Sequence, residues 1–98
     1  MIAPLFIPLA GRYFNAFLDG SKTEEWRLAG PRWGEQTCQI GRRVILSRGY
    51  SGDRVEAEIT GFSRQILDSE TYGPARELAV IRLRVLGSRK VPPPAGSR

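Results

Sequence analysis

The sequence contains no histidine and a single cysteine, Cys38, among its 98 residues. Without histidine, the chain can build neither a Ser-His-Asp triad nor a Cys-His pair, and it lacks the most common general base. One thiol excludes an internal disulfide and, without histidine, makes no zinc site, so we expect neither a metal nor another cofactor. Any catalysis must therefore use Lys, Glu, Asp, Tyr, Ser, Thr or Cys38. The scarcity of cysteine also favours a reducing, cytoplasmic compartment.

The chain also lacks an apolar run of about 20 residues, the length that crosses a bilayer. Its first ten residues, MIAPLFIPLA, are apolar, but they have no basic start and they contain Pro4 and Pro8. We interpret them as a strand between prolines rather than as a signal peptide. The sequence therefore predicts a soluble protein without a membrane partner.

What is present is an ordinary globular composition, with 41% hydrophobic and 26% charged residues. The length suits one small domain, which we predict over residues 1–87, followed by a disordered, basic, proline-rich tail over residues 88–98. The formal net charge is +5, of which Arg89, Lys90 and Arg98 of the tail supply three, leaving +2 for the domain. Because such a tail strengthens salt-sensitive contacts with polyanions, the charge alone argues only weakly for specific nucleic-acid binding.

Hydrophobic periodicity predicts a strand and then a helix in the first twenty residues. The apolar residues at 2–7 favour a strand. After Ala10, apolar residues recur at spacings of three and four, which is the stripe of an amphipathic helix. Gly20 stands where a left-handed residue ends such a helix. The stripe consists of Tyr13, Phe14, Phe17 and Leu18.

Four further segments favour strands. Residues 23–28 are short and extended, and residues 42–48 form a β-branched, apolar run. Residues 54–62 and 78–86 alternate apolar with polar side chains, which is typical of strands with one buried face. Residues 65–72 allow a helical turn. Because strands outnumber helices and are mostly linked as hairpins, we predict an antiparallel α+β fold or a small open barrel rather than a βαβ layout.

Residues 20–27, GSKTEEWR, concentrate charge directly after the predicted helix. If the chain is extended from Thr23, then Thr23, Glu25 and Arg27 share one face, and Lys22 can reach the same patch from the turn. Such a cluster can bind a polar, partly anionic ligand, and its members can tune one another's protonation. The alternative is a surface ion-pair cluster worth about 0–1 kcal/mol per pair, and composition alone favours this alternative.

A second cluster, Ser47, Arg48 and Tyr50, lies at the mouth of the predicted hairpin. An arginine beside an aromatic ring suits nucleotides, because it offers hydrogen bonds to phosphates or base edges next to a stacking surface. In the alternative interpretation, Tyr50 only covers the end of the hairpin and Arg48 is solvated.

Two tryptophans and the lone cysteine complete the candidates. We expect Trp26 in the core. Trp33, beside Arg32 in a loop rich in glycine and proline, is the better candidate for the wall of a cleft. We expect Cys38 to be a buried, inert thiol rather than a nucleophile.

The spacing Gly20-x-Lys22-x-x-Glu25-x-Arg27 resembles the G-x-K-x-x-E-x-R signature of the ASCH (activating signal cointegrator homology) family, which belongs to the PUA-like superfamily. YFNAFLDG before the motif, and GPRWGEQTC, IGRRVILSRGY and LAVIRLRVL after it, resemble small stand-alone members from bacteria and phages. The resemblance covers roughly residues 3–87. It implies a PUA-like, small antiparallel or mixed β-barrel with one or two flanking helices beside a charged cleft.

The resemblance also implies single-stranded RNA or a modified nucleoside as the ligand of that cleft. The cations would then meet phosphates or polar base edges, and Trp33 and Tyr50 would offer stacking surfaces. Glu25 would orient Arg27 or accept a hydrogen bond from a base amino group, as glutamate does from cytosine. The predicted ligand-binding residues are Lys22, Glu25, Arg27, Arg32, Trp33, Arg48 and Tyr50.

Two other functions stay open. Some small ASCH-like proteins resemble amidohydrolases that act on N4-acetylcytidine with a lysine, a threonine three residues later and a glutamate, but Glu25 stands where that threonine would be. Thr23 would need a different backbone presentation, and a remaining acid would come from Glu70 or Glu77. A hydrolase or ribonuclease would draw on Lys22, Thr23, Glu25 and Tyr50. In the third interpretation, the charged cleft binds a peptide of a partner protein.

Overall fold

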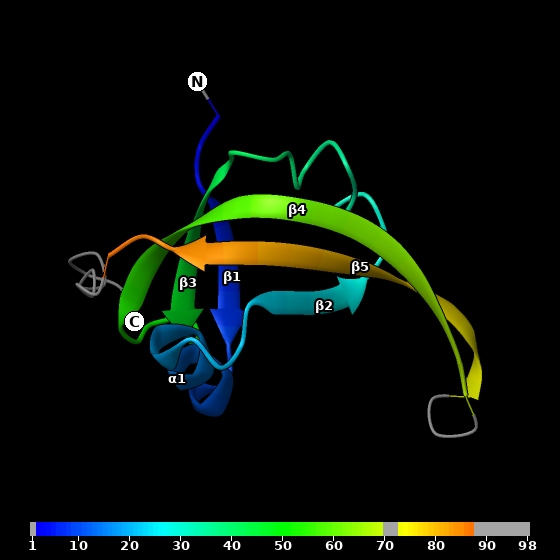
Figure 1. Cartoon of the computed structure of the whole chain (residues 1–98), viewed down its shortest axis with the longest axis horizontal. Coiled ribbons are helices and arrows are strands. Elements are labelled where there is room, and N and C mark those ends of the chain that lie inside the picture. The colour runs from blue at the N-terminus through cyan, green and yellow to red at the C-terminus, as the bar shows by residue number, and fades with distance from the viewer. Residues whose placement is uncertain (1, 70–72, 88–98) are drawn as a thin grey trace.

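One helix and five strands follow one another in the order that the sequence predicts. The computed structural model describes residues 2–69 and 73–87, so the predicted tail lies outside the described residues. The elements are β1 (Leu5–Leu9), α1 (Gly11–Asp19), β2 (Glu24–Leu28), β3 (Arg43–Arg48), β4 (Arg54–Ser69) and β5 (Gly73–Val85), as Figure 1 shows. No helix in the described part of the chain has the length and apolar character needed to cross a membrane.

The strands form one mixed sheet in the order β1-β3-β4-β5-β2. β1 runs parallel to β3, and the other neighbours are antiparallel. The fold is therefore α+β in character, but the predicted barrel is not formed, because the sheet stays open between its two edge strands, β1 and β2. Among the described residues no backbone hydrogen bond joins these two strands. Instead, Arg27 Nη2 of β2 donates to the backbone carbonyl of Pro8 in β1 over 2.8 Å, so a side chain spans the gap.

The core lies between the inner face of this sheet and α1. The alternation of β1 buries every second side chain, and the helical stripe adds Phe14 and Phe17. Each large apolar side chain buried in this way contributes about 1.5–3 kcal/mol. The buried residues of this core are Leu5, Ile7, Leu9, Phe14, Phe17, Cys38, Val44, Leu46, Val55, Ala57, Ile59, Ile81 and Leu83.

β4 and β5 form a hairpin that is longer than predicted. The helical turn expected at residues 65–72 is wrong over residues 65–69, which continue β4, and residues 70–72 lie outside the described residues. The physical reason is pairing: Ile66 lies opposite Glu77, so the ladder with β5 overrides the local preference. The end of this hairpin at which β4 leads into β5 lies far from α1 in Figure 1.

An ion-pair cluster attaches this hairpin to the loop that follows β2. Arg64 donates through Nε and Nη2 to both carboxylate oxygens of Glu35, and through Nη1 to Glu77, each over 2.7 Å. The hydrogen bonds from Arg64 are the main cause that lowers the pKa of Glu35 to about 2. The same two carboxylates raise the pKa of Arg64 above its ordinary value. The cluster thus fixes the position of the loop that carries Trp33.

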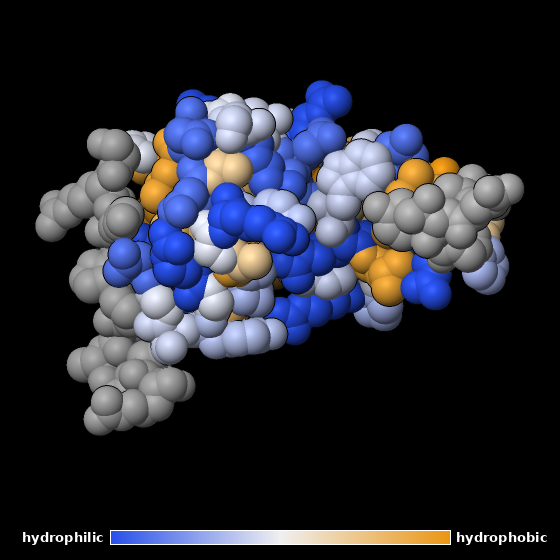
Figure 2. All heavy atoms as spheres, turned by 90° about the horizontal axis from the view of Figure 1, so that it is seen from below, coloured by the Kyte–Doolittle hydropathy of each residue, from blue (hydrophilic) through white to orange (hydrophobic). Residues whose placement is uncertain are grey.

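Figure 2 shows the side of the molecule on which α1 and β2 lie in Figure 1. Hydrophilic residues spread across the middle of this side. Apolar residues gather towards the end where the β4–β5 hairpin extends.

Candidate functional site

The end of α1 places Lys22 against the side of the helix. Gly20 has a φ of 83°, in the left-handed region that favours glycine, and ends the helix there. The backbone N–H of Lys22 then donates to the carbonyl of Ala16 over 3.1 Å. The Lys22 ammonium consequently lies 5.2 Å from the centre of the Tyr13 ring and 5.5 Å from that of Phe17. These contacts hold a lysine at a fixed place beside β2.

The alternation of β2 places two charged residues on the inner face of the sheet. Glu25 pairs in register with Ile81, and Arg27 pairs with Ala79, and both of these partners are buried. The shared face of Glu25 and Arg27 is therefore as predicted. Glu25 is only 8% exposed, which makes it the one buried acid among the described residues.

Two cations compensate the buried carboxylate of Glu25. Arg27 Nε donates to Oε2 over 2.8 Å, and Lys22 Nζ lies 3.5 Å from Oε1. Burying a carboxylate is costly unless it is paired and hydrogen-bonded, so this arrangement depends on both partners. The three side chains form a unit of net charge +1, which favours ligands that carry negative charge.

Arg27 also connects this unit to the loop after β2. Its guanidinium carbon lies 4.9 Å from the centre of the Trp33 ring, and that of Arg32 lies 5.2 Å from the same ring. Trp33 is half-buried against the core, and its backbone N–H donates to the carbonyl of Gly30 over 3.0 Å in a tight turn. The loop therefore brings Arg32 and Trp33 beside Arg27 of the unit.

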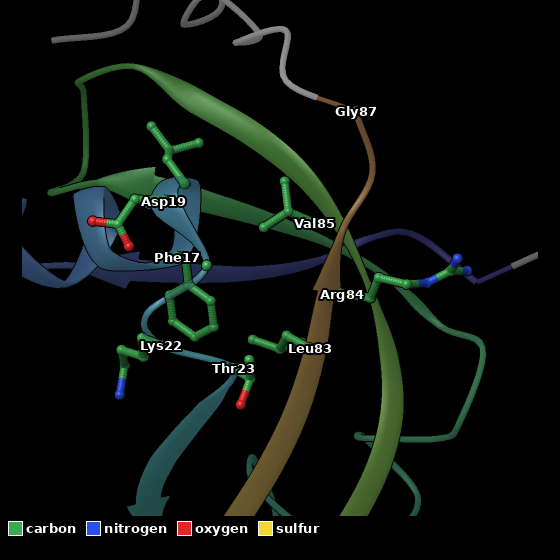
Figure 3. A pocket seen from close by; sticks show the side chains of 10 residues that line it. Phe17, Asp19, Lys22, Thr23, Leu83, Arg84, Val85 and Gly87 are labelled. Carbon is green, nitrogen blue, oxygen red and sulfur yellow. The ribbon is translucent and has the colours of Figure 1, made fainter.

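A pocket of about 600 Å³ adjoins Lys22 at the end of α1. Its apolar lining comes from Phe17 of the helix and from Leu83 and Val85 of β5, and Lys22 and Thr23 lie at its margin. Figure 3 shows the Leu83 side chain pointing towards Phe17, with the Lys22 ammonium and the Thr23 hydroxyl directed away from the helix. Sequence reasoning missed this pocket, although the alternation of LAVIRLRVL does predict that Leu83 and Val85 point inward.

Arg48 lies apart from these residues. Its guanidinium carbon is 5.1 Å from the centre of the Phe14 ring, and Nη2 donates to the amide oxygen of Asn15. A Cβ added at Gly11 would lie 2.6 Å from Arg48 Nη1, so the arginine covers this glycine. With about 100° per residue, Gly11 and Asn15 lie across the buried stripe of the helix from the flank that Lys22 occupies. Arg48 and Lys22 therefore do not converge.

Tyr50 also lies apart from them. It is 77% exposed, and its ring centre lies 6.3 Å from that of Phe6, whose neighbours in β1 point into the core. Arg54 Nη2 donates to the Tyr50 carbonyl over 3.0 Å. Since Phe6 belongs to the outer face of the sheet, Tyr50 does not extend the cleft around Lys22.

The expectation that Trp26 belongs to the core is wrong. Trp26 is 38% exposed, and its indole N–H donates to Glu24 Oε1 over 3.0 Å. The reason is geometric: residue 26 must point away from the face that carries Glu25, and no helix covers that outer face in Figure 1.

The single thiol behaves as predicted in its burial. Cys38 belongs to the core, and desolvation by burial raises its pKa, with Arg42 opposing that shift. Within residues 2–69 and 73–87, no three His, Cys, Asp or Glu side chains are grouped so as to hold a metal ion.

No protein-family model matches this chain, and a search of curated proteins finds no match either. The function must therefore be argued from the geometry of the site.

Proposed function

We propose that this chain is a PUA-like ASCH domain that binds single-stranded RNA or a modified nucleotide in a charged cleft. The cleft consists of Lys22, Glu25, Arg27 and Trp33 together with the adjoining pocket. The observation that carries the proposal is the buried Glu25 carboxylate, held between Lys22 and Arg27 beside a pocket of about 600 Å³. A pocket lined by Lys22, with the Glu25 carboxylate and Arg27 beyond that lysine, suits a ligand that combines a flat ring with polar edges and negative charge.

The hydrogen-bonding capacity of the cleft is only partly used within the protein. Arg27 has partners for Nε and Nη2 among the described residues, which leaves Nη1 for a ligand. The Lys22 ammonium has one carboxylate neighbour for its three N–H groups. These donors suit phosphate oxygens or carbonyl groups of a base, and Glu25 suits a base amino group.

The groups of the cleft follow one another in space from the pocket to the loop. Lys22 lines the pocket, Glu25 contacts Lys22, Arg27 contacts Glu25, and Trp33 lies beside Arg27. One base would enter the pocket that Phe17 and Leu83 line, and the next nucleotides would follow this series, with Trp33 as a stacking surface. Splayed single-stranded bases fit such a cleft, whereas a duplex presents its bases only in grooves, so we favour single-stranded RNA. We also keep a cytoplasmic location as part of the proposal.

A hydrolase is the second candidate, because Lys22 and Thr23 line the same pocket. Lys22 would be the general base, and the hydroxyl of Thr23, its neighbour in sequence, would be the nucleophile that it activates. Glu77 is engaged with Arg64 and is unsuited to supply the acid, and Glu70 lies outside the described residues. Glu25 is then the acid closest to Lys22.

The test is an NMR titration of the full chain with short single-stranded RNAs and a panel of modified nucleosides that includes N4-acetylcytidine. Arg89, Lys90 and Arg98 are replaced by Gln, so that contacts of the tail do not obscure the cleft. The proposal predicts saturable shifts confined to the backbone amides of residues 22–27 and the Trp33 indole, and their loss in Glu25→Gln. Conversion of a nucleoside during the titration would instead favour the hydrolase. Absence of shifts at low salt would contradict both.

A further inference from the structure

β2 is an edge strand, and one of its two backbone edges has no partner among the described residues. The N–H of Leu83 donates to Thr23 over 2.9 Å, and the N–H of Ala29 donates to Glu77 over 3.0 Å. With the register of β2 and β5, these bonds assign the odd-numbered positions of residues 23–29 to the ladder with β5. The backbone groups that point away from the sheet belong to Glu24, Trp26 and Leu28.

The opposite edge of the sheet is protected. In β1, Pro8 has no N–H to offer, and its carbonyl already accepts from Arg27. Prolines and capped carbonyls are devices by which edge strands avoid pairing with other chains. β2 contains no proline, and nothing among the described residues occupies its outward backbone groups. The β2 edge can therefore accept a further strand, whereas the β1 edge is protected at Pro8.

The outer face of β2 carries two exposed apolar side chains beside Glu24. Trp26 is 38% exposed and Leu28 is 54% exposed. Their partners in β5 are Leu78, which is half-buried, and Val80, which is buried. An exposed edge with apolar side chains is a template for a further strand.

We propose that the edge of β2 pairs antiparallel with β2 of a second copy of this chain, to form a two-fold dimer with one continuous sheet. The sequence EEWRL is complementary to itself in this arrangement. With Trp26 on the two-fold axis, Glu25 lies opposite Arg27 of the second copy, and Arg27 lies opposite its Glu25. Opposite charges in directly facing positions stabilise such a pair of strands.

Only this register satisfies both the backbone and the charges. A shift of the axis by one residue would still pair the outward backbone groups, but it would place two Glu25 carboxylates or two Arg27 guanidinium groups opposite one another. An axis at Glu24 would place two Glu24 carboxylates opposite one another. An axis at Leu28 would shorten the paired segment and leave Glu25 without its facing arginine.

The dimer explains why Trp26 is exposed in the single chain, since its ring would lie against Trp26 of the second copy. The dimer contact shares Glu25 and Arg27 with the proposed cleft, whereas Trp26 belongs to the dimer contact alone. A five-residue contact buries less than the ~1,000 Å² expected of a stable interface, so the dimer should form in a concentration-dependent way. A strand from another protein is the alternative occupant of the edge.

The test is amide hydrogen exchange, with sedimentation velocity, on the full chain over roughly a hundredfold range of protein concentration. The amides of Glu25 and Arg27 should be protected at every concentration, because they bond to β5. Those of Trp26 and Leu28 should gain protection only as the dimer forms. A chain that stays monomeric, or whose Trp26 amide exchanges equally fast at all concentrations, would overturn the proposal and leave the edge to another protein.

Two matched variants distinguish pairing at the edge of β2 from non-specific hydrophobic association. Trp26→Lys places two like charges opposite one another at the axis and should raise the dimer Kd at least about tenfold. Ile66→Lys changes an apolar side chain that is 66% exposed on the β4–β5 hairpin and should leave the Kd unchanged. Association that survives Trp26→Lys, or that Ile66→Lys weakens equally, would also overturn the proposal.

Discussion

The two faces of β2 reverse the usual division between an apolar interior and a charged surface. On the inner face, Glu25 is 8% exposed and paired with two cations, whereas on the outer face Trp26 is 38% exposed. Apolar residues usually fill the interior, and buried acids are rare unless paired. β2 contributes little to the core, because its buried positions carry charged side chains and its exposed positions carry aromatic or apolar ones. We infer that both faces of β2 serve binding.

Breaking the inner pair should have the largest effect on folding. Arg27→Ala leaves the buried Glu25 carboxylate with Lys22 alone and removes the donor to the Pro8 carbonyl. We expect the free energy of unfolding to fall by about 3 kcal/mol, because the buried carboxylate loses its hydrogen-bonded cation and keeps only Lys22. Urea denaturation measures this as a lower midpoint with an unchanged slope.

The outer face supplies the matched control for that change. Arg82 pairs with Glu24 over 3.6 Å, and the Arg82 side chain is largely exposed. Arg82→Ala should change the free energy of unfolding by less than about 0.5 kcal/mol. If Arg27→Ala and Arg82→Ala lower the free energy of unfolding equally, the inner face of β2 does not depend on its ion pair more than the outer face does.

Removing the charge of Lys22 should affect ligand binding more than folding. Lys22→Met keeps an apolar stem against Tyr13 and Phe17 while it removes the ammonium. We expect short single-stranded RNA to bind at least about tenfold more weakly, because a cation in the cleft is lost. Fluorescence anisotropy at fixed salt measures the Kd. Arg43→Met, at an exposed ion pair with Glu56, is the control and should leave the Kd nearly unchanged.

The turn that delivers Lys22 should be sensitive to a smaller change. Gly20→Ala forces a Cβ into a φ of 83°, at a cost of about 1 kcal/mol in the free energy of unfolding. No other atom obstructs a Cβ there, so the cost comes from the backbone alone. Thermal unfolding checks this, and an unchanged midpoint would show that the turn is not a constraint.

The exposed Arg64–Glu35 pair should contribute least to stability, and its contribution should change only in acid. Its hydrogen bonds lower the pKa of Glu35 from 4.5 to about 2. A lowered folded pKa stabilises the protein above the unfolded pKa, and that contribution is lost as the pH falls from about 4.5 to about 2. NMR titration of the Glu35 carboxyl should give a midpoint near 2. In Arg64→Gln the midpoint should return towards the ordinary value.

Alternation of side chains was enough to predict that Glu25 and Arg27 share a face. It favours the wrong face of β2 as the covered one, because Trp26 and Leu28 lie on the face of Glu24, whereas the face of Glu25 and Arg27 has no apolar side chain. Arg48 and Tyr50 are close in sequence, yet one lies over α1 and the other over Phe6. The turn between β3 and β4 directs the two side chains to different places, and the sequence pattern does not reveal this.

Longer-range pairing accounts for the other differences. Local preference allowed a helical turn after Gln65, and pairing with β5 overrides it. The pocket beside Lys22 depends on the last residues of β5 passing the end of α1, which no local pattern encodes.

The most direct test of the nucleotide-binding cleft is to measure intermolecular NOEs between a bound single-stranded RNA and the side chains of the full chain. The account predicts that protons of one base approach Phe17 and Leu83, while protons of a neighbouring nucleotide approach the Trp33 indole. NOEs confined to the Trp26 indole, or none to Phe17 and Trp33 at saturation, would contradict it.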